Sequence, residues 1–152
     1  MQYWLMKSEP DAFSIDDLQK VGTEPWDGIR NYQARNFMRD DMKIGDLVFF
    51  YHSSCKIPGI VGLMEVASES YPDFTAFDSN EKYFDSRSNP EKPTWMMVDV
   101  KFVQKLAVPI TLQSLKQNPK LDGMRLLQKG NRLSIMPVEK VHWDTIMDMT
   151  NV

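Results

Sequence analysis

The sequence predicts an α+β domain built around a mixed, curved β-sheet or small β-barrel with flanking short helices. Its length of 152 residues suits one domain, and 42% hydrophobic with 26% charged residues is typical of a globular chain. About five candidate strands and four or five short helices alternate at irregular spacing. Because a repeated βαβ array needs a helix of about 10–15 residues between successive strands, that architecture is disfavoured.

The chain is expected to begin with a strand and a capped helix. Residues 3–7 are rich in aromatic side chains and form a candidate strand that stops before Pro10. Ser14, followed three residues later by Asp17, has the pattern of a capping box at a helix N-terminus. Gly22 is expected to end this helix.

The middle of the chain contains the strongest strand candidates. Residues 24–28 are typical of a turn, and residues 31–39 favour a helix. Residues 47–52 are apolar almost throughout, as expected of a central strand, and residues 59–66 form a second strand candidate. Residues 68–93 are polar and acidic and are long for a loop, which predicts that they are functional or partly structured.

The last third is expected to hold two strands and three helices. Residues 95–103 alternate in polarity, which indicates a half-buried strand. Short helices are expected at residues 111–117 and 121–129, followed by a strand at residues 132–136. Pro137 is expected to open the clearest helix, since apolar residues follow it at helical spacing.

Charge and composition narrow the function. The formal net charge is −3, unlike that of a strongly basic nucleic-acid-binding protein. Acidic side chains gather in residues 65–91 and basic ones in residues 92–152, which permits a basic face. A single cysteine cannot form an internal disulfide or a multi-cysteine zinc site, and the two histidines lie far apart. No metal or cofactor is therefore expected.

The sequence also bears on location. No apolar run approaches the roughly 20 residues that a membrane-spanning helix needs, and no secretory signal is recognised at the N-terminus. We expect no membrane partner and a cytoplasmic location, or a nuclear one if the source is eukaryotic.

Known catalytic motifs are missing from the sequence, so no catalytic residue is assigned. Cys55 and His52 are close enough in sequence to form a thiol–imidazole pair. A lone cysteine is more often structural, and the sequence favours that interpretation.

Trp26 stands out among the aromatic residues because it lies in a predicted turn. A cation, an aromatic ring and two amides follow it as Arg30, Asn31, Tyr32 and Asn36. Nucleic-acid bases stack on such rings, and amide side chains can bind their edges. The alternative is a turn with its indole tucked against the protein.

Polar residues also stand at three strand ends. If these strands are neighbours, their ends would converge on one pocket mouth; otherwise these are solvated turn residues. The residues concerned are Lys7, Ser8, Glu9, His52, Ser53, Arg132 and Ser134.

Several of these segments together resemble the EVE domain family. The matching strings follow in order and extend over nearly the whole chain. They are YWLMKSEP at residues 3–10, WDGIRNYQARN at 26–36, GD at 45–46, YHS at 51–53, GIVG at 59–62, YPD at 71–73 and GNRLS at 130–134.

The resemblance implies one EVE domain over residues 1–152 with a PUA-like fold, a curved β-barrel flanked by helices. The related YTH domain captures a methylated adenine of RNA in an aromatic cage. The EVE resemblance implies a non-enzymatic domain that captures one modified base of a nucleic acid, with modified cytosine in DNA, such as 5-methylcytosine, as the leading candidate. A reader of modified RNA bases is the alternative, and a monomer is expected.

The resemblance also implies a set of base-binding residues. Trp26 would match a cage tryptophan, Tyr71 would cap the pocket, and Arg132 and Ser134 would touch the base or a phosphate. The full set is Lys7, Ser8, Glu9, Trp26, Arg30, Asn31, Tyr32, Asn36, His52, Ser53, Tyr71, Arg132 and Ser134.

Two further hypotheses stay open. The same pocket could serve an enzyme acting on nucleosides or nucleotides, with Glu9 and His52 as acid and base. Alternatively, the acidic residues 65–91 could dock a protein partner.

Overall fold

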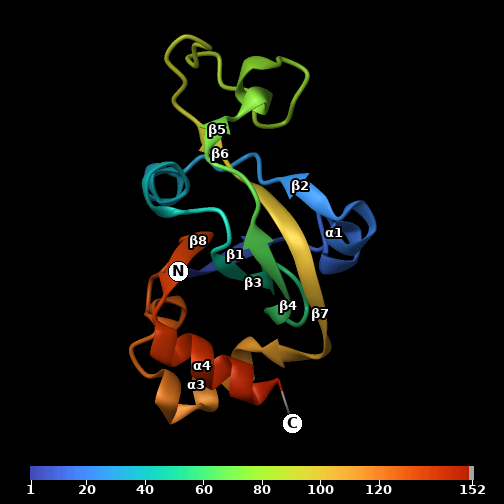
Figure 1. Ribbon diagram of the computed structural model, residues 1–152, viewed down its shortest axis with the longest axis vertical. Helices are drawn as coiled ribbons and strands as arrows, with labels where there is room; N and C mark the ends of the chain where they lie inside the picture. Colours follow the sequence, from blue (N-terminus) through green and yellow to red (C-terminus); the bar gives the residue numbers. More distant parts are fainter. Residues whose placement is uncertain (151–152) are drawn as a thin grey trace.

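The computed structural model describes residues 1–150 and contains short helices around β-strands (Figure 1). The strands are β1 (Tyr3–Ser8), β2 (Thr23–Pro25), β3 (Leu47–His52), β4 (Gly59–Val66), β5 (Tyr71–Pro72), β6 (Met96–Met97), β7 (Asp99–Thr111) and β8 (Ile135–Val138). The α-helices are α1 (Ile15–Val21), α2 (Tyr32–Asn36), α3 (Leu112–Gln117) and α4 (Lys140–Met149). Single turns follow at η1 (Phe37–Asp41, a π-helical turn), η2 (Phe74–Phe77), η3 (Pro119–Leu121) and η4 (Arg125–Leu127).

Six strands form one curled sheet in the order β2-β7-β4-β3-β1-β8. β1 and β3 run parallel, and the other neighbours are antiparallel. β5 and β6 pair separately and carry residues 73–95, which form the lobe at the top of Figure 1. The predicted α+β class, with a curved mixed sheet and flanking short helices, is confirmed.

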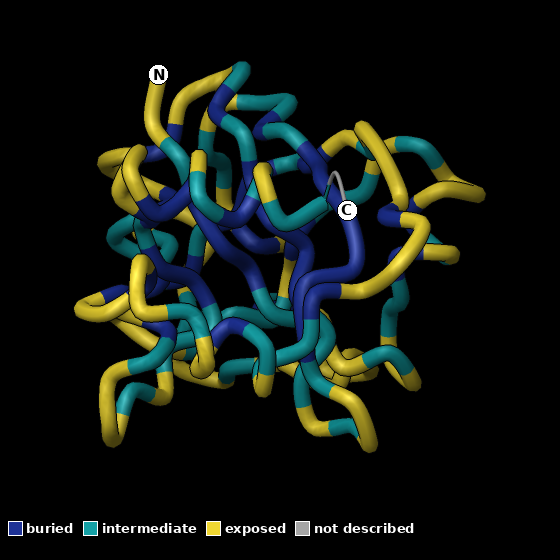
Figure 2. The backbone as a smooth tube through the Cα atoms, turned by 90° about the horizontal axis from the view of Figure 1, so that it is seen from below, coloured by how far each residue is buried: buried dark blue, intermediate teal, exposed yellow. Residues whose placement is uncertain are grey.

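The central strands are buried on both faces. Trp4 and Phe50 belong to one apolar cluster, whereas Leu5 and Phe49 belong to another on the opposite face. Successive side chains of a strand point to opposite faces, so an apolar strand can serve both clusters. Figure 2 shows the buried backbone running through the middle of the molecule. β3 is therefore the central strand that its composition predicts.

Different helices cover the two faces. Residues of α1, α2 and η1 contribute to the first cluster, and residues of α3 and α4 contribute to the second. Trp143 of α4 stacks on Phe49 of β3, with 3.8 Å between ring centroids. This stacking fixes α4 against the sheet.

Asp46 is a buried carboxylate that ties the N-terminus to the turn before β3. It is 3% exposed and accepts hydrogen bonds from the backbone N–H groups of Gln2 and Lys43 and from the indole Nε1 of Trp4, at 3.0–3.1 Å. Buried carboxylates are tolerated when such donors surround them. Asp46 thereby fixes the start of β1 beside the start of β3.

The residues that predicted the start and the end of the first helix have the expected roles. Ser14 and Asp17 form the reciprocal capping box, and Gly22, with a φ of 82°, donates its N–H to Leu18 O. Gly62 has no room for a side chain, because a Cβ there would lie 2.7 Å from the backbone oxygen of Gln104.

The expectation that Pro137 opens the last helix is wrong. Pro137 lies inside β8, and α4 begins at Lys140 after an N-cap at Glu139. β8 is an edge strand, where a proline's missing N–H is tolerated. The strand expected at residues 132–136 is accordingly shifted to Ile135–Val138.

Other boundaries also differ. Residues 121–129 form no single helix, because Gly123 adopts a φ of +87° and separates η3 from η4. Residues 24–28 are only partly a turn, since their first two residues belong to β2. The strand expected at residues 95–103 is split at Val98 into β6 and β7.

Replacing Asp46 tests its structural role. We expect Asp46→Ala to lower the free energy of unfolding by about 2–4 kcal/mol, since the buried indole N–H of Trp4 and two part-buried backbone N–H groups lose their acceptor. Urea denaturation monitored by circular dichroism measures this. The matched control, Asp122→Ala at an exposed site, should change the stability by less than about 0.5 kcal/mol. Equal stability of both variants would contradict the role assigned to Asp46.

Candidate functional site

Three strand ends meet where β1 ends. The N–H of Lys7 donates to Ser134 O at 2.8 Å, and the N–H of Ser53 donates to Ser8 O at 3.0 Å. β1 lies between β3 and β8 in the sheet, so the residues that flank each strand at this end are brought together. The conditional prediction that these strand ends converge is confirmed.

A cavity of about 820 Å³ lies at this convergence. Its walls come from the strand ends, from the start of α1, from the segment after β2 and from the lobe. The lining residues are Lys7, Ser8, Glu9, Ala12, Phe13, Glu24, Pro25, Trp26, Asp27, Gly28, Ile29, Ser53, Ser54, Lys82, Tyr83, Arg132 and Ser134.

Trp26 forms an aromatic part of the wall and is held from behind. Its backbone N–H donates to Val98 O at 2.8 Å, which continues the β2–β7 pairing. Phe50 and Phe13 contact the indole edge to face, at centroid distances of 5.5 and 6.4 Å. Trp26 is only 6% exposed, and no group within residues 1–150 accepts a hydrogen bond from its indole N–H. The ring is therefore fixed, and its N–H is free to bind a ligand.

Charges of both signs line the cavity. Burial lowers the pKa of Lys7, whose ammonium lies 5.7 Å from the centre of the Tyr51 ring and has no carboxylate partner among the described residues. Burial, followed by repulsion from Asp73 and Glu81, raises the pKa of Asp27. Such a mixture offers hydrogen-bond donors and acceptors and does not resemble a purely basic phosphate cradle.

Tyr83 closes the cavity from the lobe and is absent from the residues that the sequence predicts. Its ring lies against Gly28, where an added Cβ would come within 2.5 Å of two ring carbons. Gly28 also adopts a φ of +78°, which favours glycine. Tyr83 lies 55 residues after Gly28 in the chain. The glycine of the WDG string at residues 26–28 is the only sequence signal of a close contact at this position.

Arg30 holds the lobe in place and does not line the cavity. Its Nη1 lies 3.0 Å from Asp73 Oδ2, and its Nε and Nη2 donate to Tyr83 O at 3.0 and 2.6 Å. Its Nη2 also donates to Thr75 Oγ1 at 3.2 Å. A guanidinium can satisfy several acceptors at fixed angles in this way. The structure makes Arg30 a positioning residue for Tyr83.

Asp73 is the buried acceptor of this arrangement. Burial alone would raise the pKa of its carboxyl, but hydrogen bonds from Thr75, the Gly28 N–H and Arg30 outweigh it and lower the pKa. Its side chain is fully buried. The carboxylate therefore stays charged and links the lobe to the segment that carries Trp26.

Three more of the expected site residues build α2 and do not reach the cavity. Asn31 caps the helix, because its Oδ1 accepts a hydrogen bond from the backbone N–H of Ala34 at 2.9 Å. Tyr32 stacks on Trp95 at a centroid distance of 5.0 Å. Asn36 accepts hydrogen bonds from the guanidinium of Arg35. Their polar groups serve local structure.

His52 and Tyr71 also lie outside the lining. His52 Nε2 accepts a hydrogen bond from the N–H of Ile15 at 3.2 Å, and burial lowers the pKa of this imidazole. Tyr71 donates its hydroxyl to Asp99, and burial followed by that bond raises its pKa. His52 thus anchors α1, and this placement argues against a Glu9–His52 acid–base pair.

Within residues 1–150 we find no cluster of three histidine, cysteine or acidic side chains arranged to hold a metal ion. Among the same residues, no helix has the length and apolar character needed to cross a membrane.

Comparison with known proteins agrees with the sequence strings. The EVE domain model matches residues 2–149. The chain belongs to the EVE domain family. Thymocyte nuclear protein 1 of Rattus norvegicus is 46% identical over 165 aligned positions, which cover 97% of this chain and 73% of that protein.

Solved structures resemble this EVE domain throughout. A hypothetical protein from Leishmania major has a TM-score of 0.95 at 50% identity, covering 99% of this chain and 95% of the other. Human thymocyte nuclear protein 1, solved in complex with DNA containing 5-methylcytosine, has a TM-score of 0.93 at 42% identity. That comparison covers 100% of this chain and 99% of the human one.

Substituting Arg30 tests its hold on the lobe. We expect Arg30→Lys to accelerate amide hydrogen exchange in residues 73–85 by about tenfold, since a lysine cannot replace the forked hydrogen bonds. Arg39→Lys, at an exposed pair with Asp40, is the matched control and should leave exchange in this segment unchanged. Unaltered exchange in the Arg30 variant would contradict the positioning role.

Proposed function

We propose that this EVE domain captures a single modified base of DNA, with 5-methylcytosine as the first candidate, and that it catalyses no reaction. The observation that carries the proposal is the cavity beside Trp26 in a chain so similar to human thymocyte nuclear protein 1. That human protein was solved with 5-methylcytosine-containing DNA.

The cavity has the size and chemistry that a base requires. Its volume of about 820 Å³ lies within the range of about 300–1,000 Å³ typical of small-ligand sites. Trp26 and Phe13 offer apolar surface, and Tyr83 faces the cavity from the lobe. Lys7 and Glu9 offer a donor and an acceptor to the edge of the base. We infer that the ring contacts aromatic side chains while these polar groups bind its edge.

Capturing one base requires that it leave the duplex stack or start in a single strand. Flipping costs a few kcal/mol, which weakens binding to a fully paired duplex. Most of the binding energy would then come from the base and little from phosphates. A domain of net charge −3 can work in this way, and the salt dependence of binding should be shallow.

The methyl group alone gives limited selectivity. Burying one methyl contributes about 0.8 kcal/mol, or roughly a fourfold preference over unmodified cytosine. We therefore infer moderate discrimination by this domain acting as a monomer. The similar thymocyte nuclear protein 1 is named as a nuclear protein, which supports a nuclear location for this domain if its source is eukaryotic.

Removal of Trp26 tests base capture. We expect Trp26→Ala to weaken binding of a 5-methylcytosine oligonucleotide by about tenfold or more, since base–aromatic contacts contribute roughly 1–3 kcal/mol. Fluorescence anisotropy of labelled oligonucleotides measures this at fixed salt. Tyr32→Ala, an aromatic change outside the cavity, is the matched control and should keep the affinity.

The oligonucleotide panel also separates the alternatives. Cytosine, 5-methylcytosine, 5-hydroxymethylcytosine and N6-methyladenine should each be presented in single-stranded DNA, double-stranded DNA and RNA. Selective binding of a DNA member supports the proposal, and selective binding of an RNA member would replace it with an RNA reader. Uniform binding throughout, with Trp26→Ala equal to the parent protein, would overturn base capture.

The pKa of Lys7 gives a pH test. Burial lowers this pKa, so the donor ammonium is lost at a lower pH than that of an ordinary lysine. We expect affinity for the 5-methylcytosine oligonucleotide to fall as the pH rises in the parent protein, before the pH reaches the ordinary lysine pKa of about 10.4. Lys7→Arg stays charged and should show a flat profile. Parallel profiles would exclude a role for the Lys7 charge in binding.

A further inference from the structure

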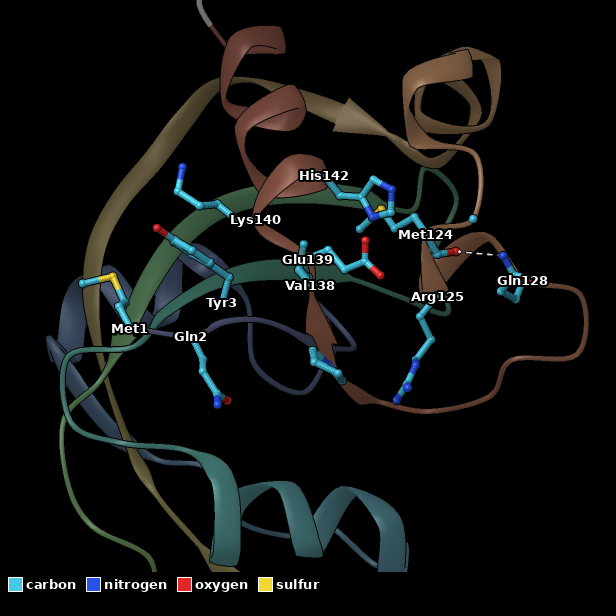
Figure 3. Close-up of a pocket in the computed structure, with 12 residues that line it drawn as sticks. Met1, Gln2, Tyr3, Met124, Arg125, Gln128, Val138, Glu139, Lys140 and His142 are labelled. Atoms are coloured by element: carbon cyan, nitrogen blue, oxygen red, sulfur yellow. Dashed lines mark hydrogen bonds between the residues drawn. The ribbon is translucent and has the colours of Figure 1, made fainter.

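A second cavity, of about 670 Å³, lies at the other end of the β1–β8 strand pair. Tyr3 pairs with Val138 at this end. Met6 pairs with Ile135 at the opposite end, near the cavity beside Trp26, which we call the base cavity. The lining comes from the N-terminus, from the segment around η4 and from the start of α4 (Figure 3). The two cavities share none of their lining residues.

The first turn of α4 opens into this cavity without a cap. Glu139 stands at the N-cap position and makes no side-chain hydrogen bond to the helix. The N–H groups of the first turn, including those of Lys140 and Val141, therefore lack an intrahelical acceptor. α4 has ten residues, so its N-terminus attracts anions through these N–H groups and the helix dipole.

His142 is a second and independent sign of a ligand. It lines the cavity and is only 7% exposed (Figure 3). Neither ring nitrogen has a hydrogen-bond partner within the part of the chain that the structure describes. Its ring nitrogens are not among the buried atoms that lack a hydrogen-bond partner in residues 1–150, so they are open to the cavity, where a ligand can bond to them.

Arg125 adds a cation to the lining of the cavity. Its side chain is exposed, forms no ion pair within residues 1–150, and lies 5.8 Å from the ring centre of Phe37. An unpaired guanidinium has two parallel N–H groups, which match the geometry of a phosphate. Lys140, by contrast, is engaged with Asp144 at 2.8 Å.

We propose that this second cavity binds the phosphate group of a nucleotide, between Arg125, His142 and the first turn of α4. The cavity is larger than a phosphate needs, and its remaining wall includes Tyr3, Met124 and Val138. The Tyr3 ring packs at a tilt against Trp143, with 4.7 Å between the ring centroids, which holds it in position for the organic part of the ligand.

Glu139 limits which phosphates can bind. Its carboxylate is in the lining and has no partner among residues 1–150, so it repels an incoming anion. A monophosphate meets less repulsion than a di- or triphosphate. The site should therefore favour monophosphates, and neutralising Glu139 should strengthen binding.

The test is a ¹H–¹⁵N NMR titration of the full chain with deoxycytidine 5′-monophosphate, with deoxycytidine as the ligand lacking phosphate. The amides of Lys140 and Val141 report on the second cavity, and those of Ser8 and Ser53 report on the base cavity. We expect only the monophosphate to shift the α4 amides. A third arm, a short single-stranded oligonucleotide without a terminal phosphate, distinguishes backbone phosphate from free nucleotide as the source.

Three variants decide the outcome. Arg125→Gln should weaken the effect at α4 by about tenfold, and Glu139→Gln should strengthen it by a few-fold. Lys129→Gln, an exposed change outside the lining, should leave it unchanged. The proposal is overturned if no phosphate-bearing ligand shifts the α4 amides, or if Arg125→Gln and Lys129→Gln behave alike. Because each cavity has its own reporters, a silent base cavity would leave this result intact.

Discussion

The ion pair between Arg30 and Asp73 is the interaction on which the base cavity depends. Residues 73–95 leave the main sheet and return to it as a lobe, and Arg30 binds two separate points of that lobe. Asp73 also accepts the N–H of Gly28, close to Trp26 in the chain. One buried carboxylate and one guanidinium thus set the distance between the Trp26 wall and Tyr83. The cavity owes its shape to contacts that lie behind its lining.

The strand order provides the second constraint. Since β1 is paired with β3 on one side and β8 on the other, residues that follow or precede these strands must meet at its ends. The base cavity forms where β1 ends, and the second cavity forms where it begins. The central strands are buried on both faces, which leaves functional side chains to strand ends and to the loops beyond them.

The candidate site was partly predictable from residue types. Lys7 and Ser53 lie at the ends of apolar strands and do line the cavity, and Trp26 does so from a segment after β2. His52 has equally suggestive chemistry, yet its Nε2 binds the first N–H of α1. Whether a polar side chain faces a ligand or a backbone donor depends on which element packs beside it, and composition does not contain that information. Tyr83 was not predictable for the same reason.

The sequence by itself determined the local structure that short-range hydrogen bonds and periodicity control. Ser14 and Asp17 specify the start of α1 within four residues, and the apolar run at 47–52 specifies a strand buried on both faces. Only the tertiary structure decided that Pro137 belongs to an edge strand and that Arg30 binds Asp73. The physical reason is sequence separation. Contacts between segments that are distant in the sequence depend on how the whole sheet packs. A pattern of neighbouring residues does not contain that information.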